Sequence, residues 1–236
     1  MFLSVVIPAY NEGKRIPATL QSLKEYFKDK DYEYEILVVV DGAKDNTAQV
    51  VKDANIPNLK LIDNKENCGK GCVVRQGMLE AKGKYRLFMD ADNATTIDHV
   101  EKLLPYFDKD YDVVIASLGV KGAEIVNNEK LYKRIFGLSS NLIIQIVLVP
   151  GIKDTQRGFK IFTAKAAEDI FKRLTLDRWG FDFEALAVAR KLGYKIKEVP
   201  VHWKNDPKSL VTLGAYIKTL LEVVKVRLNL WEGEYK

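Results

Sequence analysis

Short apolar runs that end at turn residues, and that alternate with helical patterns, constrain the fold of this chain more than any other feature. The apolar runs occupy residues 3–7, 36–40, 59–62 and 85–89, and the helical patterns occupy residues 15–27, 46–54 and 71–81. Apolar strands with helices between them are typical of a parallel sheet that is covered on both faces. The order therefore predicts an α/β protein with a doubly wound, mostly parallel sheet flanked by helices.

The composition fits one such domain and argues against several classes of protein. With 236 residues, of which 47% are hydrophobic, the chain can bury a core of its own. The net charge of +5 is spread along the chain, which suits an anionic small molecule or an anionic membrane surface and does not predict nucleic-acid binding. The cysteines, Cys68 and Cys72, form neither a zinc pattern nor a disulfide framework, which favours a reducing compartment.

No run of residues has the composition of a membrane span. The longest uncharged run, residues 135–152, contains serine, asparagine, glutamine, proline and glycine. We therefore expect a soluble or peripheral protein.

Carboxylates follow the first, second and fourth apolar runs. Glu12 comes shortly after the first run, Asp41 directly after the second, and Asp90 and Asp92 after the fourth. Taken singly, each of them is better explained by a turn or a helix N-cap, where aspartate is common. Because the carboxyl ends of parallel strands meet at one edge of a sheet, these side chains should converge there. The sequence therefore predicts a ligand site at this edge.

The Asp90-Ala91-Asp92 triplet indicates what that ligand is. At the end of a strand, residues i and i+2 project to the same side. Two carboxylates side by side repel each other unless a cation lies near them. Mg²⁺ takes one or two carboxylates and completes its coordination with phosphate oxygens. The pair therefore predicts a divalent metal, Mg²⁺ or Mn²⁺, which would neutralise charge on a departing nucleoside diphosphate.

Other nucleotide and catalytic motifs are absent from the sequence. The Gly69-Lys70-Gly71 triplet is not a P-loop, because Asn64 and Gly71 stand where Gly and Ser/Thr belong. No G-x-G-x-x-G follows an apolar run, which argues against a nicotinamide or flavin dehydrogenase. Neither His99, expected on a helix, nor His202, expected on a strand, pairs with a nucleophile.

Several segments of the chain resemble the family 2 inverting glycosyltransferases, which have the GT-A fold. In the N-terminal half these are VVIPAYNE (5–12), VVVDGAKDNT (38–47), NCGKG (67–71) and MDADNAT (89–95). In the C-terminal half DTQRGFKIF (154–162), RWGFDFEAL (178–186) and GYKIKEVPVHW (193–203) resemble the dolichyl-phosphate glucosyl- and mannosyltransferases. The resemblance spans residues 2 to about 213 and implies transfer of a hexose from a nucleotide sugar.

The resemblance also implies roles for particular residues on the donor side. Pro8, Tyr10 and Glu12 would hold the nucleoside, and the carboxylate of Asp41 would accept a hydrogen bond from the base. Lys70 would approach the diphosphate. Asp90, Ala91 and Asp92 match the DxD motif that positions the diphosphate and the metal.

On the acceptor side the resemblance implies a second group of residues. Residues 156–159, with Gln156 and Arg157, and residues 182–184, with Asp182 and Glu184, would form that side of the cleft. Arg134 and Arg157 are candidates for binding a phosphate, because a planar guanidinium suits its oxygens. The family carries a lysine in a Gly-Ser-Lys triplet, and in this chain either Lys208 supplies it from two positions earlier or the contact is absent.

The chain departs from the family pattern at several positions. Val40 and Ala43 replace the first Asp and the Ser of an Asp-Asp-Gly-Ser segment, and Leu118 stands where an arginine is common. The C-terminal triplet reads Lys208-Ser209-Leu210. These changes bear on which donor and acceptor are used and not on the fold.

The acceptor decides whether a general base is needed. A phosphate monoester has a second pKa of about 6 and is largely ionised near neutrality, so a lipid phosphate needs no strong base. A sugar hydroxyl would need one, and Asp182 is the candidate. The alternative for Asp182 is the N-cap of a helix within residues 179–186.

The residues from 207 onward form a predicted amphipathic helix. Apolar residues recur at helical spacing, at Leu210, Leu213, Ile217, Leu220, Leu221, Val224, Leu228 and Trp231. This helix either lies on an anionic membrane or packs on the domain or a partner subunit. Residues 135–149 present the same alternatives.

We expect a GT-A domain over residues 1–206 with a helical tail over 207–236. The favoured function is inverting transfer of a hexose to a polyprenyl or dolichyl phosphate, with UDP-glucose favoured over GDP-mannose. The protein would act at the cytoplasmic face of a membrane, alone, as a homo-oligomer or with a separate membrane subunit. The alternatives are transfer to a saccharide or protein-linked glycan, and a non-catalytic subunit that binds sugar nucleotides.

Overall fold

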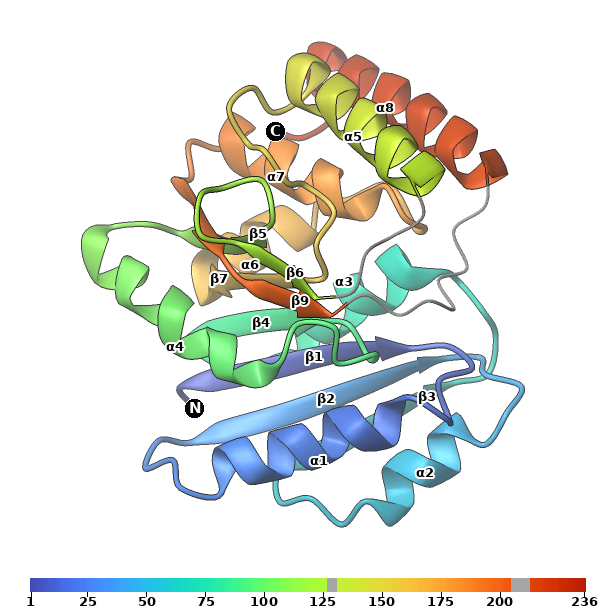
Figure 1. Cartoon of the computed structure of the whole chain (residues 1–236), viewed down its shortest axis with the longest axis vertical. Coiled ribbons are helices and arrows are strands. Elements are labelled where there is room, and N and C mark those ends of the chain that lie inside the picture. The colour runs from blue at the N-terminus through green and yellow to red at the C-terminus, as the bar shows by residue number, and fades with distance from the viewer. Residues whose placement is uncertain (127–130, 205–212) are drawn as a thin grey trace.

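A seven-stranded sheet forms the centre of the protein. The computed structural model describes residues 1–126, 131–204 and 213–236, and the side chains within them except those of 131–136, 138 and 213–217. The strands are β1 (Leu3–Ala9), β2 (Tyr34–Asp41), β3 (Leu59–Asn64), β4 (Tyr85–Met89), β5 (Val113–Ser117), β7 (Phe159–Thr163) and β8 (Ile196–Pro200), in the order β3-β2-β1-β4-β7-β5-β8. Strand β7 runs antiparallel to both of its neighbours, and the other pairs are parallel. The predicted doubly wound, mostly parallel sheet is confirmed (Figure 1).

Helices cover both faces of this sheet. They are α1 (Ile16–Phe27), α2 (Thr47–Asp53), α3 (Lys70–Glu80), α4 (Val100–Leu103), α5 (Leu131–Val147), α6 (Ala164–Phe171), α7 (Phe181–Lys191) and α8 (Leu213–Glu232), with 3-10 turns at Ile97–His99 and Leu104–Lys109. Alternate residues of a strand point to opposite faces. Accordingly Leu37 and Val39 enter the core with α3, α6 and α7, while Ile36 and Val38 enter the core with α1, α2 and α4.

The first strand continues past the predicted stop at Pro8. Strand β1 pairs with β4 only as far as Val6, opposite Phe88, but pairs with β2 through Ala9. Pro8 therefore lies beyond the β1–β4 pairing, where a residue without an amide hydrogen is tolerated. The turn that follows β1 still leads directly to the edge where a ligand site was expected.

A small second sheet lies beside the main one. It pairs β6 (Glu124–Val126) with β9 (His202–Lys204) in parallel. The predicted positions of the histidines are confirmed, with His99 in the first 3-10 turn and His202 in β9. The backbone amide of His202 donates a hydrogen bond to Nε2 of His99 over 3.0 Å. Histidine contacts therefore help to hold the small sheet against the domain.

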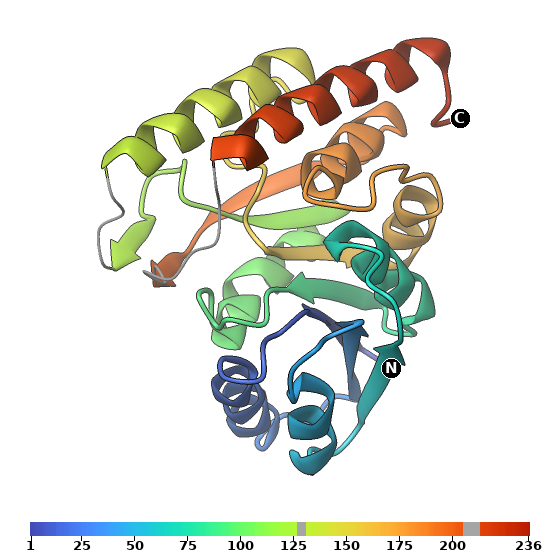
Figure 2. The same cartoon turned by 90° about the vertical axis from the view of Figure 1, so that its right-hand side faces the viewer.

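The C-terminal helix packs on the domain along one face. Helices α5 and α8 lie side by side across the end of the molecule, and α8 also contacts α7 (Figure 2). Val223 and Val226 of α8 are buried, and so is Tyr235 beyond it. The hydroxyl of Tyr235 donates to the carboxylate of Glu184 over 2.7 Å. This face of α8 therefore packs on the domain, which is one of the alternatives considered for the tail.

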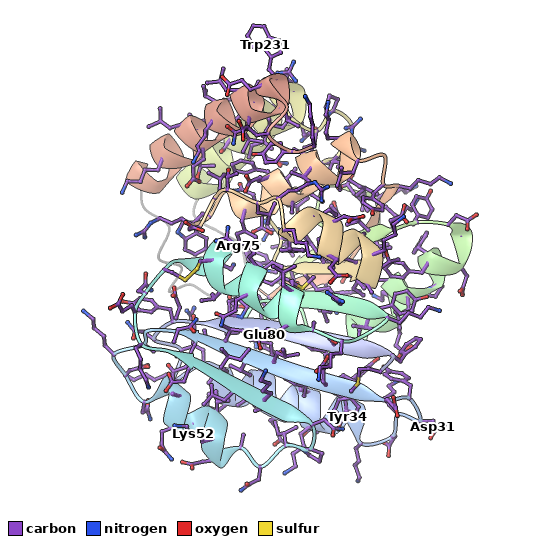
Figure 3. The ribbon with its side chains drawn as sticks, turned by 180° about the vertical axis from the view of Figure 1, so that it is seen from behind. Asp31, Tyr34, Lys52, Arg75, Glu80 and Trp231 are labelled. Atoms are coloured by element: carbon purple, nitrogen blue, oxygen red, sulfur yellow. A yellow bond between two sulfur atoms is a disulfide. The ribbon has the colours of Figure 1, made fainter. Side chains whose placement is uncertain are left out.

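The cysteines correct one inference from the sequence. Cys68 and Cys72 form a disulfide, visible as a yellow bond at the start of α3 in Figure 3, although their spacing was not that of a disulfide framework. Cys68 stands just before the N-cap residue Gly69, and Cys72 lies in the first turn of α3. This brings their Cα atoms to 5.8 Å, within the range that a disulfide spans. The two cysteines therefore give no support for a reducing compartment.

Candidate active site

A pocket lies where the carboxyl end of β4 meets the residues that precede β7. Its lining side chains and backbone come from Asp90, Asp92, Ala94, Thr95, Gln156, Arg157, Gly158 and Trp203. Four residues that the sequence predicted for the donor and acceptor sides, Asp90, Asp92, Gln156 and Arg157, thus face one space. This convergence follows from the sheet, because β7 pairs with β4 and brings Gly158 beside Asp90.

Asp90 is held by its backbone and by an ion pair. Its amide donates to the carbonyl of Gly158 over 3.0 Å, and Oδ1 lies 2.6 Å from Nζ of Lys70. A Cβ atom on Gly158 would stand 2.0 Å from Oδ2 of Asp90, so only glycine leaves room for the carboxylate. Lys70 is the first residue of α3, which places its amine across the sheet edge from β4.

Asp92 completes the acidic pair of the pocket. Its Oδ1 accepts a hydrogen bond from the amide of Ala94 over 3.0 Å, which fixes the turn after β4. Burial raises the pKa of the Asp92 carboxyl, and the neighbouring charge of Asp90 raises it further. Between them Ala91 is buried, and its carbonyl accepts from the hydroxyl of Thr19 over 2.6 Å.

The acidic pair has the chemistry of a divalent metal site. Both carboxylates offer hard oxygens to the same pocket, and a cation beside Asp92 would offset the repulsion that raises its pKa. No group of three or more His, Cys, Asp or Glu side chains suited to a metal occurs in the part of the chain that the structure describes. The pair therefore fits an ion whose remaining ligands come from a bound phosphate and water, and not a metal enclosed by protein.

The predicted nucleoside residues surround the end of β1. Pro8 is buried, whereas Tyr10 is exposed. Glu12 is paired with Arg15, whose Nε lies 2.6 Å from Oε2. Burial raises the pKa of Glu12, and the charges of Asp92 and Asp90 add to the rise in spite of Arg15, so Glu12 lies within electrostatic reach of the acidic pair.

Asp41 is hydrogen-bonded to the loop that precedes α3. Its side chain is buried, with Oδ1 accepting from the amide of Cys68 and Oδ2 accepting from the amide of Gly69 and the side chain of Asn67, all over 2.8–3.0 Å. The carboxylate is thus used to hold the loop before α3. Through this loop Asp41 helps to position Lys70, and its contact with a nucleotide base stays a prediction.

Arg157, predicted for the acceptor side, lines the pocket and is held by two contacts. Its guanidinium lies 4.5 Å from the centre of the Trp203 ring, and its Nε donates to Oδ2 of Asp154 over 3.0 Å. Asp154 in turn accepts from the amide of Leu118, the residue that replaces the arginine of the family pattern. A guanidinium held on one edge and stacked on an aromatic ring presents its remaining donors in a fixed direction, which suits a phosphate.

Asp182 is paired with a buried lysine. Its Oδ1 lies 2.5 Å from Nζ of Lys160, and both side chains are almost fully buried. Burial raises the pKa of the Asp182 carboxyl, while the charges of Lys160 and Lys70 oppose that rise. The N-cap of α7 is Gly180, so the N-cap alternative for Asp182 is wrong. Asp182 stands behind the pocket wall and is not among the residues that line it.

The remaining predicted acceptor residues are not brought to the pocket. Glu184 is fully buried, where it accepts from the amides of Thr175 and Leu176 and the hydroxyl of Tyr235. It therefore anchors the chain around α7. Arg134 lies in α5 but its side chain is outside the described residues, as is the whole of Lys208.

Sequence reasoning missed residues that act beside the predicted ones. Lys160 and Trp203 lie in motifs that carried the family resemblance, yet neither had a role assigned to it. Trp203 lies far from Arg157 in the sequence, so only the folded structure shows that its ring stacks on this arginine. A buried lysine such as Lys160 looks like any surface lysine in a sequence.

Comparison with known proteins identifies the family of this chain. Residues 4–171 match the family described as Glycosyl transferase family 2. The chain belongs to glycosyltransferase family 2. Relatives within this family include the dolichyl-phosphate beta-glucosyltransferase of Dictyostelium discoideum, 35% identical and covering 100% of this chain and 77% of that protein. The enzyme of the same name from Saccharomyces cerevisiae is also 35% identical, with the same two coverages.

A solved glycosyltransferase shows the same fold. Glucosyl-3-phosphoglycerate synthase from Mycobacterium tuberculosis, in complex with Mn²⁺, UDP-glucose and phosphoglyceric acid, superposes with a TM-score of 0.72. The alignment covers 96% of this chain and 79% of that one, at 15% identity. At that identity the likeness supports the fold alone, and it confirms the GT-A architecture expected from the sequence.

Proposed function

We propose that this glycosyltransferase moves glucose from UDP-glucose to a dolichyl or other polyprenyl phosphate, with inversion and with Mg²⁺ or Mn²⁺. The observation that carries the proposal is the pocket in which Asp90 and Asp92 face Arg157. An acidic pair suits the metal-bound diphosphate of a donor, and a fixed guanidinium suits the phosphate of an acceptor. The names of the relatives support glucose as the sugar and dolichyl phosphate as the acceptor.

The proposed reaction needs no protein base. An oxygen of the acceptor phosphate forms a bond to the anomeric carbon of glucose, and the bond from that carbon to the β-phosphate oxygen of the donor breaks. The electron pair leaves with UDP, and an α-linked donor gives a β-linked product. The attacking phosphate is largely ionised near neutrality, since its second pKa is about 6, so no proton has to be removed.

The residues of the pocket would position the two anionic partners. Asp90 and Asp92 would hold the metal, which when bound supplies a positive charge for the leaving diphosphate. Arg157, stacked on Trp203, would hold the acceptor phosphate in line with the anomeric carbon. Lys70 lies close enough to the acidic pair to serve the diphosphate as well.

A saccharide acceptor is the second candidate, and the surroundings of Asp182 argue against it. A hydroxyl acceptor needs a base, but Asp182 is bound to Lys160 and buried behind the pocket. Among the residues that the structure describes, the carboxylates lining the pocket are Asp90 and Asp92. A pocket that offers both an acidic pair and a guanidinium supports an enzyme with two anionic partners over a non-catalytic subunit.

We further propose that an apolar face formed by α5 and α8 rests on the membrane that carries the acceptor. Its exposed residues are Leu142, Ile143 and Ile146 of α5 and Leu221, Val224, Leu228 and Trp231 of α8. Trp231 is 86% exposed and projects from the end of the molecule (Figure 3). Exposed Lys218, Lys225 and Arg227 flank the α8 stripe, as expected for contact with anionic lipid.

The described helices do not offer another mode of attachment. None of them is long and apolar enough to cross a bilayer. We propose that the apolar face of α5 and α8 lies in the interface between the membrane and water, on the cytoplasmic side, where UDP-glucose is available. The alternative to the membrane is that a second copy of the chain, or a separate membrane subunit, covers this face.

The first experiment measures transfer of label from UDP-glucose and GDP-mannose to a polyprenyl phosphate. Label should enter the organic phase with UDP-glucose, only when Mg²⁺ or Mn²⁺ is present, and Asp92→Ala should abolish it. Lys65→Ala, which changes an exposed residue 86% accessible at its side chain, is the matched control and should be unaffected. Transfer to a saccharide but not to the lipid phosphate would overturn the proposal.

The membrane proposal has its own test. Flotation with vesicles of phosphatidylcholine and phosphatidylserine should recover the wild type with the vesicles, and the variant Leu221→Glu/Trp231→Glu should remain largely unbound. Each substitution places a charge in the apolar stripe without touching the buried face of α8. Equal recovery of the wild type and the variant would show that this face does not bind the membrane.

A further inference from the structure

The amine of Lys70 is paired with the carboxylate of Asp90, which is one of the two carboxylates that would bind the metal. Its Nζ lies 2.6 Å from Oδ1 of Asp90, and its side chain is 20% exposed. Aromatic rings surround the amine, with the ring centres of Trp179 and Phe88 at 5.1 and 5.3 Å. This ion pair makes Lys70 the cation that stands against Asp90.

The backbone of Lys70 is anchored, whereas its amine is on a flexible stem. Gly69 before it has a φ of +104°, and a Cβ there would lie 2.4 Å from the carbonyl oxygen of Asp177. Asp41 and the Cys68–Cys72 disulfide hold the same turn. The loop cannot move far, but the four-carbon side chain can carry the amine from Asp90 to a neighbouring anion.

The charges around Asp90 show when that movement is favoured. Three carboxylates, Asp90, Asp92 and Asp182, face two lysines, Lys70 and Lys160, which gives a formal charge of −3 + 2 = −1. A divalent ion alone would change this to +1 and would stand beside the amine of Lys70. A diphosphate that carries two negative charges returns the sum to −1 and offers the amine a new partner. The metal and the amine are therefore compatible only when the diphosphate is present.

We propose that Lys70 is a resident counter-cation of Asp90, which competes with the divalent metal until a nucleotide sugar arrives and then moves to its diphosphate. Metal and donor consequently bind cooperatively, and a metal without a donor binds weakly. The inference rests on the proposed function, since it assumes a nucleotide-sugar donor and a metal at Asp90 and Asp92. It adds an order of binding that neither the motif nor the relatives specify.

The test measures binding of Mn²⁺ from the electron paramagnetic resonance signal of the free ion, with and without saturating UDP. Lys70→Met should bind Mn²⁺ alone about tenfold more tightly than the wild type, because the competing amine is gone. In the wild type UDP should tighten Mn²⁺ binding by about 10-fold or more, within the usual range of coupling between ligands, and in Lys70→Met this gain should largely disappear. Because coupling is reciprocal, Mn²⁺ should tighten UDP binding by the same factor.

Two variants serve as controls for charge and for folding. Lys65→Met removes an exposed positive charge away from the pocket and should leave both Mn²⁺ constants unchanged. Lys70→Arg keeps the charge beside Asp90 and should retain most of the coupling. Near-ultraviolet circular dichroism of each variant checks that the fold is intact before binding is compared.

The outcomes separate this inference from the proposed function. If the wild type binds Mn²⁺ with UDP, but Lys70→Met binds Mn²⁺ alone no more tightly than the wild type, only the role of Lys70 is overturned. If no variant binds Mn²⁺ even with UDP, the metal site itself is wrong and both proposals fail.

Discussion

Replacement of Lys160 by methionine tests how the pocket wall is held together. Lys160 is 1% exposed and is the ion-pair partner of Asp182, whose side chain is 4% exposed. Methionine keeps most of the volume and removes the charge, which leaves the carboxylate of Asp182 buried beside a neutral residue. Loss of one partner of a buried ion pair costs about 3–5 kcal/mol of the free energy of unfolding.

Other contacts of Lys160 do not add much to this figure. Its amine also donates to the carbonyl of Arg157, but that carbonyl keeps a second donor, the amide of Phe159 at 2.9 Å. The loss should be smaller at acidic pH, because a protonated Asp182 is no longer an unpaired charge. In a domain of this size a loss of 3–5 kcal/mol lowers the melting temperature by about 6–20 °C.

Urea denaturation followed by circular dichroism measures the effect through the midpoint at constant slope. The double variant Lys160→Met/Asp182→Leu should recover most of the loss, since a buried ion pair replaced by apolar residues of similar volume is often close to neutral. Lys172→Met breaks an exposed pair with Glu168 and should change stability by less than about 0.5 kcal/mol. A loss below about 1 kcal/mol in Lys160→Met, or a double variant less stable than the single one, would refute this account of the wall.

The remaining predictions concern acidic pH and the space around Asp90. Burial lowers the pKa of His99, whose Nε2 accepts a hydrogen bond from the amide of His202. Below the ordinary pKa of 6.5, His99 therefore binds a proton more readily in the unfolded chain than in the folded one. The free energy of unfolding should therefore fall as the pH drops below about 6.5, by up to about 1.4 kcal/mol per pH unit, and His99→Gln should remove this part of the slope in denaturation curves. Gly158→Ala would displace the carboxylate of Asp90 and should lower the transfer rate about 100-fold, a size typical of a 1 Å misplacement. The control Gly137→Ala, where a Cβ meets nothing within 4 Å, should transfer at the wild-type rate, and equal activity of the two alanine variants would contradict the reasoning.

Much of the fold could be predicted from local patterns along the chain. The run at residues 85–89 became β4 with the same bounds, and the helical pattern at residues 71–81 became α3 within one residue at each end. Such patterns are readable because periodicity reports directly which side chains face a core. The pairing of Asp90 with Asp92 at one pocket followed for the same reason, since both residues lie in one turn at the end of one strand.

For several predicted site residues, the sequence did not show which groups bind the side chain. Asp41 and Glu184 carry carboxylates in motifs of the family, yet their oxygens are taken up by backbone amides of the loop before α3 and of the segment before α7. Nothing in the residues near Asp182 indicates that Lys160 neutralises it. The disulfide between Cys68 and Cys72 depended on the geometry at the start of α3, which the spacing alone did not reveal.

The sequence by itself determined the class of fold, the edge of the sheet where the candidate pocket lies and the family to which the chain belongs, because these depend on periodicity and on short motifs. Only the tertiary structure decided which charges oppose one another around the pocket. The pairs Lys70–Asp90, Lys160–Asp182 and Arg157–Asp154 set the electrostatics of the site, and two of them join different elements of the fold. A charge acts through its distance from other charges and through its burial, and both quantities exist only once the chain has folded.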